Sequence, residues 1–199
     1  LNYQPNRAAQ SLVNSKTFTI GVIVPNLGYP YYSNAMQGIE DEASRRGYSV
    51  IACQSMERIE KEVIHANNML RSGIDGIIIS LAQHSDNVEL FRQVRQKKLP
   101  LVFFDRVTDE LNTSKVIVDN VAGAFGATEH LIRVGCRRIA FMAGPKELVI
   151  SNRRIEGYKL ALIKYKLPFD ETLLVHCEFD HDSSVKIATK IFNLKKPPD

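Results

Sequence analysis

Residues 18–24 read FTIGVIV, a short run rich in β-branched residues that stops at Pro25. A run of this length and composition predicts a buried strand. Over residues 32–46 the apolar positions change to helical spacing, and Gly47 follows the last of them, as is typical of a helix C-cap. The sequence therefore predicts a buried strand that leads directly into a helix.

The same alternation continues along the rest of the chain. Further strands are predicted over residues 48–53, 76–80, 101–104, 116–118, 138–143 and 173–175. Further helices are predicted over residues 59–70, 88–97, 122–134, 151–165 and 183–192. Strands that are apolar throughout and alternate with helices indicate parallel strands covered on both faces. The predicted fold class is α/β, a doubly wound parallel sheet, whose ligands bind at the carboxyl ends of the strands.

The composition is that of an ordinary globular protein. The chain has 199 residues, of which 44% are hydrophobic and 24% charged, and a formal net charge of +4. These values exclude a disordered chain, a collagen-like repeat and a disulfide-dense secreted module. Cys53, Cys136 and Cys177 are widely spaced and have no ligand-spaced histidine nearby, so we expect free thiols in a reducing compartment and no zinc site.

The sequence contains neither an apolar leader before residue 17 nor an apolar run near the roughly 20 residues of a membrane span. We therefore expect a cytoplasmic protein with no membrane partner. Because the chain starts without Met and ends in KKPPD, we also expect a fragment of a longer polypeptide.

Enzyme signatures are missing from the sequence, which has no G-x-G-x-x-G, Walker loop, H-E-x-x-H or G-x-S-x-G. Asp105, Asp109 and Asp119 follow or precede predicted elements, where acid–base chemistry is possible. A loop turn for Asp109 and a helix N-cap for Asp119 are the favoured interpretations. The sequence predicts no catalytic residue, no metal site and no cofactor.

The loop after the first strand, residues 26–33 (NLGYPYYS), contains Tyr29, Tyr31 and Tyr32. Tyrosines offer flat apolar faces with a polar tip, which suits a sugar or purine ring. Packing of Tyr31 or Tyr32 beneath the following helix is the alternative. The pair Arg153–Arg154 could grip a hydroxyl pair, a carboxylate or a phosphate, or could form a salt bridge on a solvated face.

The first sixteen residues do not continue the alternation. One face of a possible helix holds Pro5, Ala8, Ala9, Leu12 and Val13. The opposite face holds Asn6, Arg7 and Gln10. So short a helix is unstable alone in water and would form only against a partner or a ligand. A frayed end or linker is the other interpretation.

In their order and spacing, these segments resemble the LacI/GalR family of bacterial transcription regulators across residues 1–199. Residues 1–12 (LNYQPNRAAQSL) resemble the hinge helix that joins a helix-turn-helix headpiece to the effector-binding core. Residues 19–25 (TIGVIVP) resemble the first strand of that core. The further matches are Asp119-Asn120 with Gly123, residues 129–132 (EHLI), residues 138–145 (RIAFMAGP) and residues 154–158 (RIEGY).

The resemblance implies a periplasmic-binding-protein-like core. Its implied parts are a hinge helix or linker (1–16), an N-terminal α/β subdomain (17–137) and a partial C-terminal α/β subdomain (138–199). It further implies that a small effector (a sugar, sugar phosphate or nucleoside) binds between two lobes, and that the core forms a homodimer. The implied effector-binding residues are Tyr29, Tyr31, Tyr32, Asp105 and Arg154.

Binding of operator DNA is implied through the hinge and through a headpiece that the sequence does not contain. The implied DNA-binding residues are Asn6, Ala9, Gln10 and Leu12. Leu12 resembles the leucine that wedges into the minor groove, a contact that unstacks a base step and kinks the duplex. Gln10 departs from the usual arginine, and Cys136 from a common histidine. Residues 148–150 (LVI) are apolar where some members have polar effector contacts.

The predicted function is that of a ligand-responsive, DNA-binding transcriptional regulator, with repression favoured. A periplasmic-type sugar-binding receptor is the alternative, because it shares the core fold. An enzyme on a doubly wound sheet is a third class, and no set of residues recommends it.

Overall fold

The computed structural model of the chain describes residues 16–83 and 88–199. The chain divides into two compact units, Leu1–Ile117 and Val118–Asp199. The predicted hinge helix, with Asn6, Ala9, Gln10 and Leu12, lies outside the described residues.

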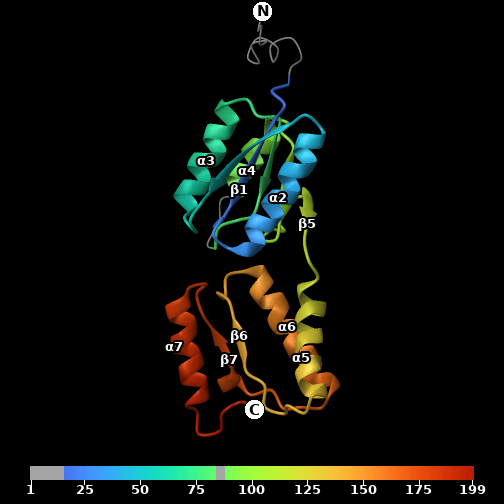
Figure 1. Ribbon diagram of the computed structural model, residues 1–199, viewed down its shortest axis with the longest axis vertical. Coiled ribbons are helices and arrows are strands. Elements are labelled where there is room, and N and C mark those ends of the chain that lie inside the picture. Colours follow the sequence, from blue (N-terminus) through green and yellow to red (C-terminus); the bar gives the residue numbers. More distant parts are fainter. Residues whose placement is uncertain (1–15, 84–87) are drawn as a thin grey trace, which may run out of the picture. The chain divides into compact units, whose positions relative to one another are not determined.

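The first unit alternates strands and helices as the sequence predicts (Figure 1). Its elements are β1 (Thr19–Val24), α2 (Pro30–Arg45), β2 (Ser49–Gln54), α3 (Ile59–Arg71), β3 (Gly76–Ile79), α4 (Val88–Gln96), β4 (Leu101–Phe104) and β5 (Ser114–Val116). The strands form one sheet in the order β2-β1-β3-β4-β5, and all neighbours are parallel. The predicted α/β fold class with a parallel sheet is therefore confirmed.

Helices cover both faces of this sheet, and the side chains of β1 pack against helices on both faces. Successive strand side chains point to opposite faces. Ile23 accordingly packs with residues of α3 and α4, whereas Val22 and Val24 pack with residues of α2. All three are fully buried, so the second half of β1 has no solvent face, whereas Phe18 at the start of the run lies outside the strand and is exposed.

The second unit is smaller. Its elements are α5 (Asn120–Arg133), β6 (Phe141–Ala143), α6 (Val149–Lys164), the short 3₁₀ helix η1 (Glu171–Leu173), β7 (Leu174–His176) and α7 (His181–Phe192). β6 and β7 pair in parallel (Figure 1). Tyr158 on α6 is buried and stacks on Phe141, and its hydroxyl donates to the carbonyl of Ile139 at 2.9 Å.

The two compact units divide after Ile117, whereas the sequence-based boundary between the α/β subdomains lies after Arg137. The reason is the packing of α5, which the sequence had placed in the first part. A Cβ atom on Gly157 of α6 would lie 2.2 Å from the carbonyl oxygen of Val121 and 2.9 Å from the amide nitrogen of Phe125, so the two helix backbones are in close contact. Helix α5 therefore belongs to the second unit.

Two predicted strands are shifted or shortened by more than one residue. The strand predicted over residues 116–118 is β5 at Ser114–Val116, because Ser114 pairs with Val102 of β4. The strand predicted over residues 138–143 is reduced to Phe141–Ala143, the residues that pair with β7. Helix α2 begins two residues earlier than predicted, at Pro30, because proline is well suited to the first turn of a helix.

Within the described part of the chain, no helix is both long and apolar enough to cross a membrane. The same residues contain no cluster of three or more potential metal ligands. The three cysteines are free thiols.

Asp170 makes the stability of the second unit depend on pH in the acidic range. Its carboxylate accepts hydrogen bonds from the Thr172 hydroxyl at 2.7 Å, from Arg138 Nη1 at 2.6 Å and from the Thr172 amide at 2.9 Å, and these bonds lower its pKa to about 2. A carboxyl with a lowered folded pKa adds stability above its unfolded value, here near 3.8, and loses it as the pH falls through about 2.

We therefore expect the urea midpoint of the second unit to fall between pH 4 and pH 2, and the fall to be smaller in Asp170→Asn. Circular dichroism during urea titration would measure it. Glu171→Gln, an exposed neighbour in η1, is the matched control and should keep the wild-type pH dependence. An unchanged fall in Asp170→Asn would contradict this role for Asp170.

Candidate functional site

The carboxyl ends of the strands in the first unit carry a buried polar cluster. Tyr32, in the first turn of α2, is 3% exposed, and its hydroxyl donates to Asp105 Oδ2 at 2.8 Å. The hydroxyl also lies 3.3 Å from Ser80 Oγ, which follows β3. Asp105 itself follows β4 directly and has a positive φ of 56°. The ends of two strands, β3 and β4, are thus connected to α2 through one tyrosine hydroxyl.

The Tyr32 hydroxyl is held in its protonated form. Burial raises the pKa of Tyr32 well above its ordinary value; the nearby charge of Arg106 lowers it and that of Asp105 raises it. A protonated hydroxyl can donate, and Asp105 Oδ2 accepts from it. The direction of this hydrogen bond is therefore fixed, and Asp105 retains acceptor capacity for other donors.

Arg106, the next residue, is buried and forms an ion pair with Glu57 of the β2–α3 loop. Its Nη1 lies 2.7 Å from Glu57 Oε2 and 3.0 Å from Oε1. The backbone amide of Gln83 donates to Glu57 Oε2 at 2.9 Å. Burial alone would lower the pKa of Arg106, but its hydrogen bond with Glu57 and the charges around it raise the pKa above its ordinary value. Arg106 is thus a buried, charged residue next to the carboxyl end of β4.

A second carboxylate fixes the loop that follows β3. Glu62, on the first turns of α3, is fully buried and accepts a hydrogen bond from the Ala82 amide at 2.7 Å. Together with the bond from the Gln83 amide to Glu57, this contact ties successive amides of one loop to two carboxylates. The loop that presents Ser80 is therefore held by the neighbouring loop and helix.

The other two tyrosines of the predicted site, Tyr29 and Tyr31, lie next to Tyr32. Tyr31 packs edge-on against Tyr32 with ring centroids 5.3 Å apart, and the Tyr29 ring lies 6.4 Å from that of Tyr32. Tyr32 packs against Phe104 beneath α2, as the alternative interpretation foresaw, yet keeps its hydroxyl on Asp105. Tyr31 is 48% exposed. The structure thus brings together Tyr29, Tyr31, Tyr32 and Asp105.

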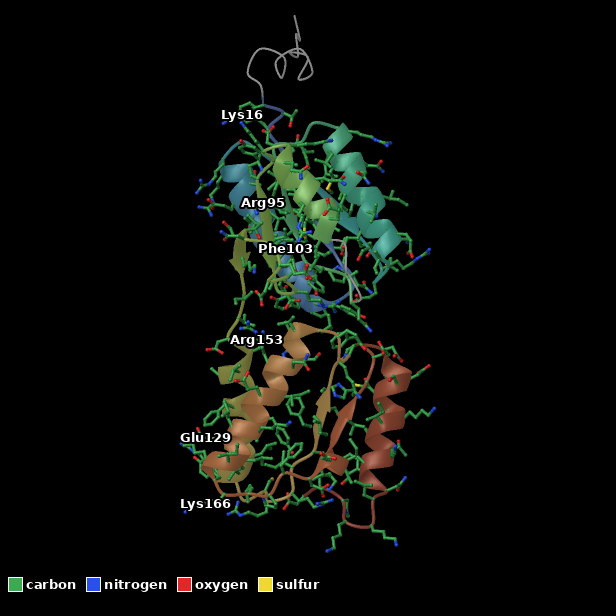
Figure 2. All side chains as sticks on the ribbon, turned by 180° about the vertical axis from the view of Figure 1, so that it is seen from behind. Lys16, Arg95, Phe103, Glu129, Arg153 and Lys166 are labelled. Atoms are coloured by element: carbon green, nitrogen blue, oxygen red, sulfur yellow. The ribbon has the colours of Figure 1, made fainter. Side chains whose placement is uncertain are left out.

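Arg154 lies in the second unit, on α6, next to Arg153 at the helix start (Figure 2). Its Nε donates to Asn120 Oδ1 at 2.8 Å, which ties α6 to the first residue of α5. Arg154 also lines a cavity of about 250 Å³ beside the carboxyl ends of β6 and β7. The lining residues are Phe141, Met142, Ala143, Gly144, Ser151, Arg154, Cys177, Glu178, Phe179 and Ser184.

Two other aspartates take structural positions. Asp119 caps α5 by accepting from the Ala122 amide at 2.9 Å, as predicted. Asp109 pairs with Lys115 Nζ at 2.9 Å on the surface. Both contacts fit structural rather than catalytic roles.

Four polar residues at this edge were not predicted from the sequence: Glu57, Glu62, Ser80 and Arg106. A signal existed for two of them, because Ser80 ends one predicted strand and Arg106 follows Asp105 at the end of another. No spacing rule connects Glu57 to Arg106. Figure 2 shows the side chains of this unit around the labelled Phe103 of β4, the buried strand that ends at this edge.

Comparisons with known proteins agree with this architecture. The model of the family described as periplasmic binding proteins and sugar binding domain of LacI family matches residues 17–199. Catabolite control protein A of Priestia megaterium is 31% identical over 199 residues, which cover 100% of this chain and 59% of that protein. The ribose operon repressor of Halalkalibacterium halodurans is 32% identical over 188 residues, 94% of this chain and 54% of that protein.

Among solved structures, the complex of the transcriptional regulator CelR with cellobiose is 27% identical and superposes with a TM-score of 0.78, covering 96% of this chain and 63% of that chain. The chain thus spans less than two thirds of the length of these relatives. The family match includes all the described elements of both units. The chain belongs to the family of periplasmic binding proteins and LacI-family sugar-binding domains.

Proposed function

We propose that this chain is the effector-binding part of a DNA-binding transcriptional regulator, with repression as its favoured action. The observation that carries the proposal is the Tyr32–Asp105 pair, a built polar group at the carboxyl ends of parallel strands, where ligands of such sheets bind. Relatives named as repressors and transcriptional regulators support the regulatory role, and for this reason no enzymatic reaction is proposed.

The proposed effector is a small hydroxylated molecule of the sugar, sugar phosphate or nucleoside class. Tyr29 and Tyr31 would contact its ring and Asp105 would accept from its hydroxyls; the role proposed for Arg154 is to donate to oxygen atoms of the effector. The solved CelR complex, which contains cellobiose, supports a carbohydrate-like ligand. The cavity beside Arg154 has polar groups for such a ligand, including Ser151 and Ser184.

The regulatory mechanism requires coupling. We propose that the complete polypeptide acts in the cytoplasm as a homodimer, whose paired residues 1–16 order on operator DNA. An effector changes DNA affinity only if it binds the DNA-competent and DNA-incompetent states with different affinities, a coupling that is typically about 1–3 kcal/mol. Asn6, Ala9, Gln10 and Leu12 would contact the duplex, with Leu12 as the minor-groove wedge.

A thermal-shift screen of sugars, nucleosides and sugar phosphates tests the proposed effector class. A ligand present at a hundred times its Kd should stabilise the folded chain by about 2.7 kcal/mol. A screen in which no compound of these classes raises the melting temperature would contradict the proposed effector. Sequencing the gene upstream of Leu1 separates the two candidate functions, because an encoded helix-turn-helix supports the regulator and an encoded apolar leader supports the receptor.

Leu12→Ala tests the proposed DNA contact in the complete protein. We expect operator affinity in a gel-shift titration to fall at least about tenfold, because the apolar wedge offsets the energy of unstacking a base step. Effector affinity should stay nearly unchanged. Val13→Ala, the neighbouring apolar residue, is the matched control. Undiminished operator affinity in Leu12→Ala would exclude the wedge assignment.

A further inference from the structure

Glu57 occupies a site built for an anion. Its carboxylate accepts from Arg106 Nη1 at 2.7 and 3.0 Å and from the Gln83 amide at 2.9 Å. A guanidinium group beside a backbone amide is the donor arrangement that proteins use to bind phosphate and carboxylate ligands. Here the anion is supplied by the chain itself.

The backbone that presents Glu57 is unusual. Met56 and Glu57 have consecutive positive φ values of 53° and 57°, in the left-handed region that residues with side chains rarely adopt. Such conformations persist only when the surrounding structure holds them, and they cluster at functional sites. The bonds from Ser55 to the carbonyl of Val24 and from Met56 to that of Pro25 hold this loop against the end of β1.

The Arg106–Glu57 ion pair changes the net charge near a ligand at the carboxyl ends of the strands. Arg106 is 5% exposed and Asp105 is 9% exposed, so both are shielded from water and their charges are weakly screened. With Glu57 paired to Arg106, the charge of Asp105 is left over among these three residues. In the second unit, the cavity beside Arg154 also contains Glu178, a charge of opposite sign.

We propose that Glu57 is a specificity-determining residue that fills the anion site of Arg106 and the Gln83 amide, so that the effector site accepts neutral polyhydroxylated ligands and rejects phosphorylated ones. This inference rests on the proposed effector-binding function and narrows its ligand class. A phosphate group would have to displace a carboxylate already bound to Arg106, and would do so beside the charge of Asp105. The hydroxyl groups of a neutral ligand can instead donate to Asp105.

Inorganic phosphate is the probe that tests the anion site. Glu57→Ala removes the internal carboxylate and leaves its donors in place. In isothermal titration calorimetry we expect this variant to bind phosphate at least about tenfold more tightly than wild type, because a partly desolvated ion pair is worth this much or more. Adding Arg106→Gln to the same chain should abolish the gain.

Glu60→Ala is the matched control. It removes the same charge from the start of α3, but Glu60 is exposed and lies 3.7 Å from the exposed Arg58, where solvent screens the pair. It should not gain phosphate binding. Glu57→Gln, which keeps the side-chain shape and removes only the charge, provides a second variant if Glu57→Ala does not fold, and should change phosphate binding in the same direction.

Two results would overturn the proposal. One is tight phosphate binding by the wild-type chain; the other is no gain in whichever Glu57 variants fold. Because the probe is phosphate alone, the result is independent of the effector screen. A chain that gains phosphate binding in Glu57→Ala, yet binds no sugar or nucleoside, would contradict the proposed function and leave the anion site intact. For an effector that the screen does identify, the neutral form should bind wild type more tightly than its phosphate ester.

Discussion

Gly157→Ala is expected to destabilise the second unit by about 3 kcal/mol, the upper part of the range for overpacked cores. The added Cβ would lie 2.2 Å from the Val121 carbonyl oxygen, 2.9 Å from the Phe125 amide nitrogen and 3.0 Å from the Ala124 Cβ. The first two are backbone atoms of α5, which cannot move aside as the end of a flexible side chain can. The two helices would have to separate. Urea unfolding followed by circular dichroism would measure the loss.

Gly126→Ala is the control for this prediction. Gly126 lies on α5, and a Cβ added there would meet no atom within 4 Å. Alanine is a better helix former than glycine, so this change should stabilise the unit by up to about 1 kcal/mol. If the two substitutions had the same effect, the close contact between α5 and α6 would be wrong, and with it the assignment of α5 to the second unit.

Asp105→Asn is expected to weaken effector binding about tenfold to a hundredfold, because a hydrogen bond to a charged group contributes about 1.5–3 kcal/mol. The substitution keeps the side-chain shape and leaves an oxygen that can still accept from Tyr32. Asparagine also tolerates a positive φ better than most residues, so the φ of 56° at this position should add little strain. Calorimetric titration with the effector found in the screen would measure the change.

Asp109→Asn is the matched control, in the same loop after β4. Its carboxylate pairs with Lys115 on the surface, so effector affinity should not change. The melting temperatures of both variants separate a loss of binding from a loss of folding. Wild-type affinity in a folded Asp105→Asn chain would remove Asp105 from the proposed site.

Most of the fold could be predicted from the sequence because its signals are local. The apolar run of β1 and the helical periodicity of α2 lie close together in the chain, and the parallel sheet follows from their repetition. Strand ends were harder to predict, as residues 138–143 illustrate. That run is apolar enough for a longer strand, but only Phe141–Ala143 has a partner in β7. Pairing, rather than composition, sets the length of a strand.

The polar cluster at the strand ends could be predicted only in part, for a similar reason. Tyr32 could be proposed because the loop after the first strand contains a local cluster of tyrosines, whereas the effector-binding role of Asp105 was implied by the resemblance to the LacI/GalR family. Glu57 and Arg106 meet across 49 positions of sequence, and only the folded loops bring them together. The domain boundary also depends on a tertiary contact, that of Gly157 with α5, and the sequence contains no local sign of it.

The central claim is that the polar cluster at the carboxyl ends of β3 and β4 binds one small effector. Nuclear magnetic resonance titration of the isotope-labelled chain with the effector from the screen tests this claim directly. We predict that the amide signals of Ser80 and Asp105, which both contact the Tyr32 hydroxyl, shift together and saturate with the same Kd. Amide signals of Ser80 and Asp105 that stay unchanged at a saturating effector concentration would contradict it.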